Sequence, residues 1–230
     1  MKKYRATAAS EARVSYGIEL CAGLRVFPET APLAPAFEAL NDELNTAYTK
    51  RRNLHKPMLE KRAVFRFAHY TTDQTIRMTH RAAEIADGGR KNGPIASYLF
   101  PDGLGPVVAP YGTRQIPPTE QLVANMKHCK IAGSEALCAE WLPKLETVLG
   151  QLKTTADDYK IASKAYSDAF RDEVALRSEH YQCVDRLMGL VRAAFPNDRT
   201  RQDLIFPVME GGGDNVDGDG DGAGGAENDG

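Results

Sequence analysis

Basic residues gather between positions 50 and 81 and are the clearest candidates for a binding chemistry. Nine of them accompany only two acidic residues, which gives this stretch a net charge of +7. His55, His69 and His80 each follow an arginine by three residues, a spacing that places both side chains on one side of a helix. Such a surface suits nucleic acid or another polyanion, because cationic side chains bind phosphates. The nine residues are Lys50, Arg51, Arg52, Lys56, Lys61, Arg62, Arg66, Arg77 and Arg81.

The same charges also have an intramolecular interpretation, which we favour. Residues 135–185 hold ten acidic against six basic residues, a net charge of −4. Long helices of opposite charge select each other's register, as flanking charges do in coiled coils. We therefore expect the basic stretch to pair with the acidic one, and nucleic acid is a partner that we do not favour.

Three polar residues, Glu173, Arg177 and His180, interrupt an otherwise apolar repeat in the second half of the chain. Polar residues at such positions often fix the register or the partner of a helix. Arg51 and Lys61 fall on the corresponding repeat in the first half, so either could pair with Glu173. The sequence offers no nucleophile or pocket beside them, and we interpret the three residues as a structural polar network.

No pattern in the sequence specifies a metal, a cofactor or a reaction. A di-iron site in a helical bundle needs glutamate three residues before histidine, whereas four of the five histidines have arginine there. The segment from Asp217 to Gly222 resembles the first half of a calcium loop, but the bidentate position of that loop falls on Asn228. Phosphate-loop, dinucleotide-binding and serine-hydrolase motifs are absent from the sequence. We therefore predict a non-enzymatic protein without a cofactor.

Cysteine usage and hydropathy bear on the cellular location. The four cysteines, at positions 21, 129, 138 and 183, are scattered without a C-x-x-C pair, as in reduced intracellular proteins. The apolar runs are far shorter than the ~20 residues that span a bilayer. The first residues supply no apolar core of a secretory signal. These features predict a cytoplasmic protein without membrane insertion.

Two long helical arms must position the charged residues. In the first arm, residues 32–87, apolar residues recur at alternating spacings of three and four, which is a heptad-type seam. Pro57 lies inside this arm and predicts a kink or a break near residues 53–56. Gly88 and Gly89 predict its C-terminal end. A second seam runs through residues 118–195, with Gly133 and Ser134 marking an interruption and Pro143 either a first turn or a kink.

Residues 88–117 connect the two arms and are rich in glycine and proline. They also carry many apolar residues, which a passive linker does not need. We therefore expect the connector to pack over a bundle end or to form a contact surface. Neither arm can bury its stripe alone. The sequence therefore predicts a mainly α protein, either a long antiparallel helical hairpin or a three- or four-helix bundle.

The terminal segments are less helical in pattern. In residues 14–26 every even position is apolar, which predicts a half-buried strand in the N-terminal segment, residues 1–30. A short amphipathic helix from Glu11 is the alternative. Residues 106–109 and 204–208 are candidate partner strands for a small sheet at one end of the bundle. From about residue 210, the C-terminal segment 201–230 is rich in glycine and aspartate and predicts a disordered acidic tail.

These features together favour a structural or interaction protein that self-associates or acts as a scaffold through its helices. The alternative is a module that binds a nucleic acid or another polyanion with the basic face of the first arm. An enzyme with the connector as a lid is the least favoured interpretation. The helical body of residues 31–200 contains the residues on which each interpretation depends.

Overall fold

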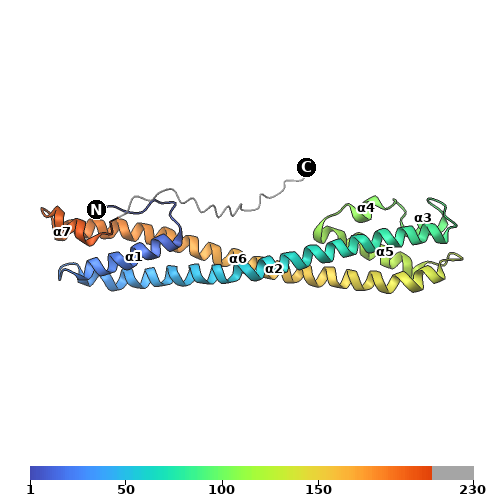
Figure 1. Ribbon diagram of the computed structural model, residues 1–230, viewed down its shortest axis with the longest axis horizontal. Coiled ribbons are helices and arrows are strands. Elements are labelled where there is room, and N and C mark those ends of the chain that lie inside the picture. Colours follow the sequence, from blue (N-terminus) through green and yellow to red (C-terminus); the bar gives the residue numbers. More distant parts are fainter. Residues whose placement is uncertain (209–230) are drawn as a thin grey trace. The chain divides into compact units, whose positions relative to one another are not determined.

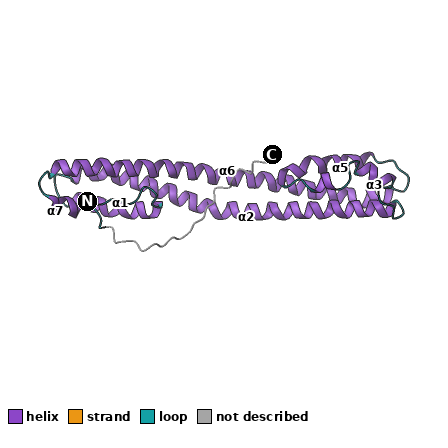
Figure 2. Ribbon diagram, turned by 90° about the horizontal axis from the view of Figure 1, so that it is seen from above, coloured by secondary structure: helices purple, strands orange, loops and turns teal. Residues whose placement is uncertain are grey.

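The computed structural model describes residues 1–208, and this part of the chain forms helices and no strand (Figure 2). The predicted acidic tail and its partial calcium loop lie outside the described residues. The α-helices are α1 (Ser10–Arg25), α2 (Ala34–Ala86), α3 (Pro94–Leu99), α4 (Gly105–Val108), α5 (Ile116–His128), α6 (Glu135–Ala194) and α7 (Arg199–Ile205). Two 3-10 turns, η1 (Ala31–Leu33) and η2 (Gly112–Gln115), precede α2 and α5. No helix among residues 1–208 is long and apolar enough to cross a membrane.

The mainly α fold with a long antiparallel hairpin is confirmed, because α2 and α6 pack against each other in opposite directions (Figure 1). The chain divides into two compact units. Unit 1 combines residues 1–45 with residues from 175 onward, and unit 2 comprises residues 46–174. Both long helices contribute to both units.

The predicted strand over residues 14–26 is wrong, and this segment lies mostly within α1. Its buried residues recur at helical spacings, as Arg13, Gly17, Leu20 and Leu24 show, whereas Ile18 at an even position is 61% exposed. The alternating pattern was coincidental. The candidate partner segments form no strand either, since residues 106–108 lie in α4 and residues 204–208 are the end of α7 and the residues that follow it.

Prolines inside the long helices do not end them. Pro57 lies within α2 and Pro143 lies beyond the first turn of α6. Both prolines are exposed, so the ring and the carbonyl left without its usual donor face solvent. α2 continues through residues 53–56, so of the predicted kink or break the break is wrong. The interruption predicted at Gly133 is present, since this residue has a φ of 90° and lies between α5 and α6.

The core of unit 1 forms where α1 and α7 cover the adjoining parts of α2 and α6. Buried residues from all four helices form one cluster, which includes Leu20, Leu24, Phe37, Val184, Leu187, Val191 and Ile205. Gly23 allows a close approach of α7 to α1, because a Cβ atom there would lie 2.1 Å from the carbonyl oxygen of Ile205. The backbones of α1 and α7 are therefore in direct contact at this glycine.

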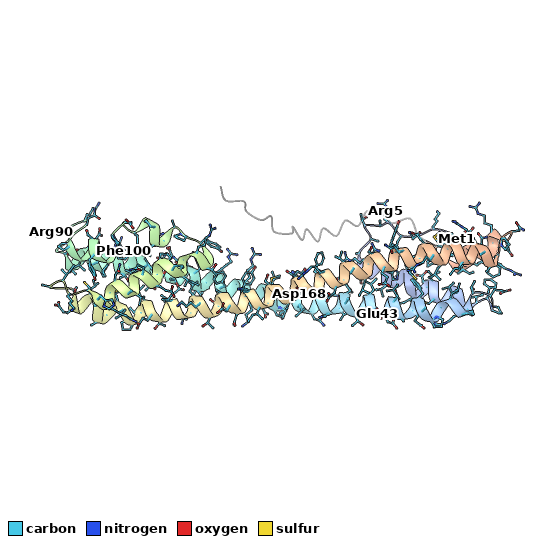
Figure 3. The ribbon with its side chains drawn as sticks, turned by 180° about the vertical axis from the view of Figure 1, so that it is seen from behind. Met1, Arg5, Glu43, Arg90, Phe100 and Asp168 are labelled. Carbon is cyan, nitrogen blue, oxygen red and sulfur yellow. The ribbon has the colours of Figure 1, made fainter. Side chains whose placement is uncertain are left out.

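The core of unit 2 forms where the connector folds back on the two long helices. Ile95 and Leu99 of α3 and Leu122 and Met126 of α5 are buried in a cluster with α2 and α6 residues, which include Ile76, Ala83, Leu145 and Leu149. Phe100, labelled in Figure 3, contacts the ring of His80 edge to face at 4.9 Å between centroids. The connector is accordingly part of the packed structure.

Threonines at the seam of α2 are accommodated by bonds within their own helix. The hydroxyls of Thr72, Thr75 and Thr79 donate to the carbonyl oxygens four residues earlier, at 2.9, 2.8 and 2.8 Å. A hydroxyl bonded in this way does not depend on a partner across the seam, and the methyl group remains available for packing. The Thr72 hydroxyl also lies 3.4 Å from the Val148 carbonyl oxygen of α6. This arrangement explains how Thr72 and Thr79 are fully buried.

Unit 1 offers a test of the close approach at Gly23. We expect Gly23→Ala to lower the free energy of unfolding by about 2 kcal/mol, because a methyl group would press on the Ile205 backbone. Gly189→Ala is the matched control, since that glycine is also helical but has nothing within 4 Å of its would-be Cβ atom. This control should gain up to about 1 kcal/mol from helix propensity. Denaturant titrations would measure both, and equal effects of the two substitutions would contradict the packing described.

Candidate functional site

The nine basic residues identified in the sequence all lie on α2 in unit 2, and only some of them form ion pairs with acidic side chains. Three of them pair across to α6: Lys50 with Asp172, Arg51 with Glu173, and Lys61 with Asp158. Lys56 and Arg77 pair along α2 with Glu60 and Asp73. Arg52, Arg62, Arg66 and Arg81 are exposed and form no ion pair within residues 1–208. Pairing between the arms therefore accounts for only part of the basic stretch.

The pair of Arg51 and Glu173 is the most buried of these ion pairs. The Glu173 side chain is fully buried and that of Arg51 is 16% exposed. Arg51 donates from Nε to Glu173 and from Nη1 to the Tyr166 hydroxyl at 3.2 Å, and its guanidinium lies 5.7 Å from the Phe170 ring centroid. This ion pair joins α2 to α6 where few large apolar residues are buried between them. We therefore interpret it as a structural contact between the two helices.

His180 occupies a hydrogen-bonded position inside unit 1. Its Nδ1 atom lies 2.7 Å from the Tyr4 hydroxyl and its Nε2 atom lies 3.0 Å from Oδ1 of Asn41. The amide oxygen can only accept, so Nε2 carries the proton and Nδ1 accepts from Tyr4. Burial, with a further contribution from the charge of Arg13, lowers the pKa of His180 from 6.5 to about 4. The ring is neutral at pH 7 and both its nitrogens have partners.

Arg177, the third member of the predicted polar network, also has partners in unit 1. Its Nε donates to the Ser10 hydroxyl at 2.6 Å, and its backbone oxygen accepts from Arg13 at 2.8 Å. Arg13 is itself buried and donates to the Ala8 carbonyl at 2.9 Å. These contacts tie the N-terminal residues and α1 to α6, and none of them leaves a side chain poised to react with a substrate.

A row of exposed apolar side chains follows one side of α2 in unit 2. Val64, Phe67, Met78 and Ile85 are 52%, 70%, 49% and 70% exposed. Together with Thr71, Thr75 and Ala82 they recur at spacings of three and four residues, which is the period of one helix side. This row lies beside the buried seam and gives α2 a second apolar stripe.

A shallow hollow of about 500 Å³ continues this row onto α6. Thr75 lines the hollow from α2, and the α6 residues that line it include Trp141, Lys144, Thr147, Val148 and Gln151. We call the α2 row and these α6 residues the open flank.

The short helix α5 covers the other flank of α6. Lys127 and Glu120 of α5 pair with Glu146 and Lys153 of α6, at 2.6 and 2.5 Å. At 100° per residue, Glu146 and Lys153 lie about half a turn from the hollow-lining positions. Within unit 2 the connector therefore covers one flank of the hairpin and leaves the open flank uncovered by residues 1–208.

Sequence reasoning found the charged residues but missed the open flank and the partners of His180. Val64, Phe67, Met78 and Ile85 fall just beside the seam, and their separations of 3, 11 and 7 residues are helical spacings that the sequence shows. The spacing alone does not tell which flank a connector will cover. Tyr4 and Asn41 are far from His180 in sequence, and only the packing of unit 1 brings them together.

Breaking the buried ion pair should be costly. We expect Arg51→Ala to destabilise the protein by about 3–5 kcal/mol, because the fully buried Glu173 carboxylate would lose its guanidinium. The double variant Arg51→Met with Glu173→Leu should be much less harmful, since it leaves no buried charge. Lys50→Ala is the control on an exposed pair, 3.9 Å from Asp172, and should cost at most about 0.5 kcal/mol. Urea unfolding would measure all three, and an equal loss for Arg51→Ala and Lys50→Ala would contradict this role.

Acid should destabilise unit 1 through His180. The unfolded histidine binds a proton near pH 6.5 and the folded one only near pH 4, so the stability is fully present above pH 6.5 and is lost as the pH falls toward 4. The loss should reach about 3 kcal/mol. Denaturant midpoints across this range, with ring NMR signals for the His180 titration, would measure it. His128→Gln, at an exposed site, should leave the profile unchanged, and a His180 signal that titrates near 6.5 would refute the prediction.

The geometry of this chain is the basis for a functional assignment. No protein-family model, curated protein sequence or solved structure matches it.

Proposed function

We propose that this chain is a non-enzymatic helical interaction protein that associates with a second copy of itself through the open flank of unit 2. The observation that carries the proposal is the row of Val64, Phe67, Met78 and Ile85 on the side of α2 that the connector leaves uncovered. Contiguous exposed apolar surface on a soluble protein commonly marks an interaction site. A helix-rich partner surface fits a row with helical spacing.

The charge of the open flank suits a second copy. Lys144 is its one charged residue, and this ammonium pairs with Glu140 at 2.7 Å and lies 4.2 Å from the Trp141 ring centroid. A nearly neutral surface gives no preference for an oppositely charged partner and no repulsion between identical copies. In a twofold contact each copy presents the same surface, which requires this kind of self-compatibility.

The size of the open flank is also sufficient for a dimer. From Val64 to Ile85 the helix rises ~32 Å, and two adjacent helices are ~20 Å wide. Face-to-face contact would bury about 600 Å² on each copy, or about 1,200 Å² in all, which is at the lower end of stable interfaces. We therefore expect a reversible dimer with a dissociation constant in the micromolar range.

Sedimentation velocity of the full chain over a range of micromolar concentrations tests the proposal. The wild type should shift from monomer to dimer as its concentration rises. Met78→Glu with Ile85→Glu should abolish the shift, because it places buried charges at the interface. Ile161→Glu is the matched control, since Ile161 is 70% exposed like Ile85 but lies on the solvent side of α6.

Two results would overturn the proposal. One is a wild-type chain that stays monomeric at every concentration. The other is a dimer that survives Met78→Glu with Ile85→Glu, since its interface would then lie elsewhere. Circular dichroism of each variant should show unchanged helix content, because the substituted side chains are 49% to 70% exposed.

A further inference from the structure

A second surface of α2 in unit 2, distinct from the open flank, carries charge that the fold does not use. Arg52, Lys56, Leu59, Arg66 and Tyr70 recur at spacings of three, four or seven residues, which places them along one side of the helix, and Arg62 precedes Arg66 by one turn. We call these six residues the outer face. All six are exposed.

The cations of the outer face have few anionic neighbours. Arg52, Arg62 and Arg66 form no ion pair within residues 1–208. Lys56 pairs with Glu60 at 3.8 Å between Nζ and the carboxylate, and both side chains are exposed. The structural role proposed above for paired charges therefore does not extend to these arginines. Unpaired arginines attract anions, and phosphate oxygens accept their forked hydrogen bonds well.

Apolar side chains alternate with these arginines. Leu59 and Tyr70 are 43% and 59% exposed. Phe67 of the open flank borders the outer face and is 70% exposed. The connector contacts α2 at Phe65 and His69, through Gly112 and Tyr111. It leaves the turns before Phe65 uncovered, and Arg66 and Tyr70 are exposed beside these contacts. A helix side that mixes arginine with leucine and aromatic residues is suited to the interface of an anionic bilayer, where rings and methyl groups enter the headgroup layer.

We infer that the outer face of α2 docks on an anionic lipid surface, with its arginines on lipid phosphates or carboxylates and with Leu59 and Tyr70 in the headgroup layer. Nucleic acid shares the phosphate chemistry and is the competing partner. Leu59 decides between the two, because an aliphatic side chain can enter a headgroup layer but has no stacking role on bases. The outer face is also one side of a helix and not a groove that tracks a strand.

Vesicle flotation of the full chain tests this inference. Vesicles of phosphatidylcholine with phosphatidylserine should bind the protein, whereas vesicles of phosphatidylcholine alone should not. Arg62→Glu with Arg66→Glu should weaken binding at least about 25-fold, at about fivefold for each arginine lost. Leu59→Ser should weaken it about fivefold without changing the charge. Raising the salt to 0.5 M should reduce binding to the wild type, because it screens the arginines.

The matched control reverses two charges on another helix of the same unit. Lys164 and Arg171 lie on α6 and both pair with Asp168, and they are 73% and 74% exposed. Lys164→Glu with Arg171→Glu should retain vesicle binding if the outer face is the site. Met78→Glu with Ile85→Glu should abolish the proposed dimer but retain vesicle binding, because it changes the open flank and keeps every arginine. The two proposals can therefore fail independently.

Three results would overturn the inference. The first is a wild-type chain that binds neither kind of vesicle. The second is an equal loss of vesicle binding in the Arg62/Arg66 and Lys164/Arg171 variants, which would show a response to net charge alone. The third is tighter binding to single-stranded DNA, at the same salt, that Leu59→Ser leaves intact, which would assign the outer face to nucleic acid.

Discussion

A pair of helices cannot enclose a core, and this limitation governs the whole chain. Each long helix has one side toward the other, and two such sides bury only a thin line of residues. Short helices supply the missing cover in each unit: α1 and α7 in unit 1, and α3 and α5 in unit 2. The large buried clusters occur where such cover is present. In the rest of unit 2, between Arg51 and Lys61 on α2, polar contacts with α6 hold the helices together.

The buried polar residues in the seams therefore fix the register of the long helices. Glu173 and His180 are each fully buried, and each has hydrogen-bonding partners from elements distant in sequence. A shift of one helix by a single turn would leave a buried carboxylate or imidazole without those partners, which is a large penalty. Apolar contacts alone would tolerate such a shift more easily, because alanine and threonine along α2 are similar in size.

The parts of the fold that depend on long repeats could be predicted from the sequence. The spacing of Phe37, Leu40 and Leu44 identifies α2 without reference to any other element, and these residues are buried. α1 was predicted only as the alternative to a strand, because its two internal glycines disfavour a helix in isolation. Their value lies in close contacts with Asn41 and Ile205, which only the tertiary structure contains. The helix does not break at Pro57, because a long helix tolerates the loss of one backbone hydrogen bond on an exposed side.

The threonines of α2 also affect the polarity of the protein surface. A hydropathy scale counts each threonine as weakly polar, and the mean hydropathy of the chain, −0.42, includes that count. The hydroxyls of Thr71 and Thr75 are bonded to carbonyl oxygens of their own helix, at 3.0 and 2.8 Å, so they offer little to water or to a partner. What these side chains present outward is chiefly a methyl group. The surface between Val64 and Ile85 is accordingly more apolar than its residue types suggest. A hydropathy scale would therefore underestimate the free energy gained when this surface is buried.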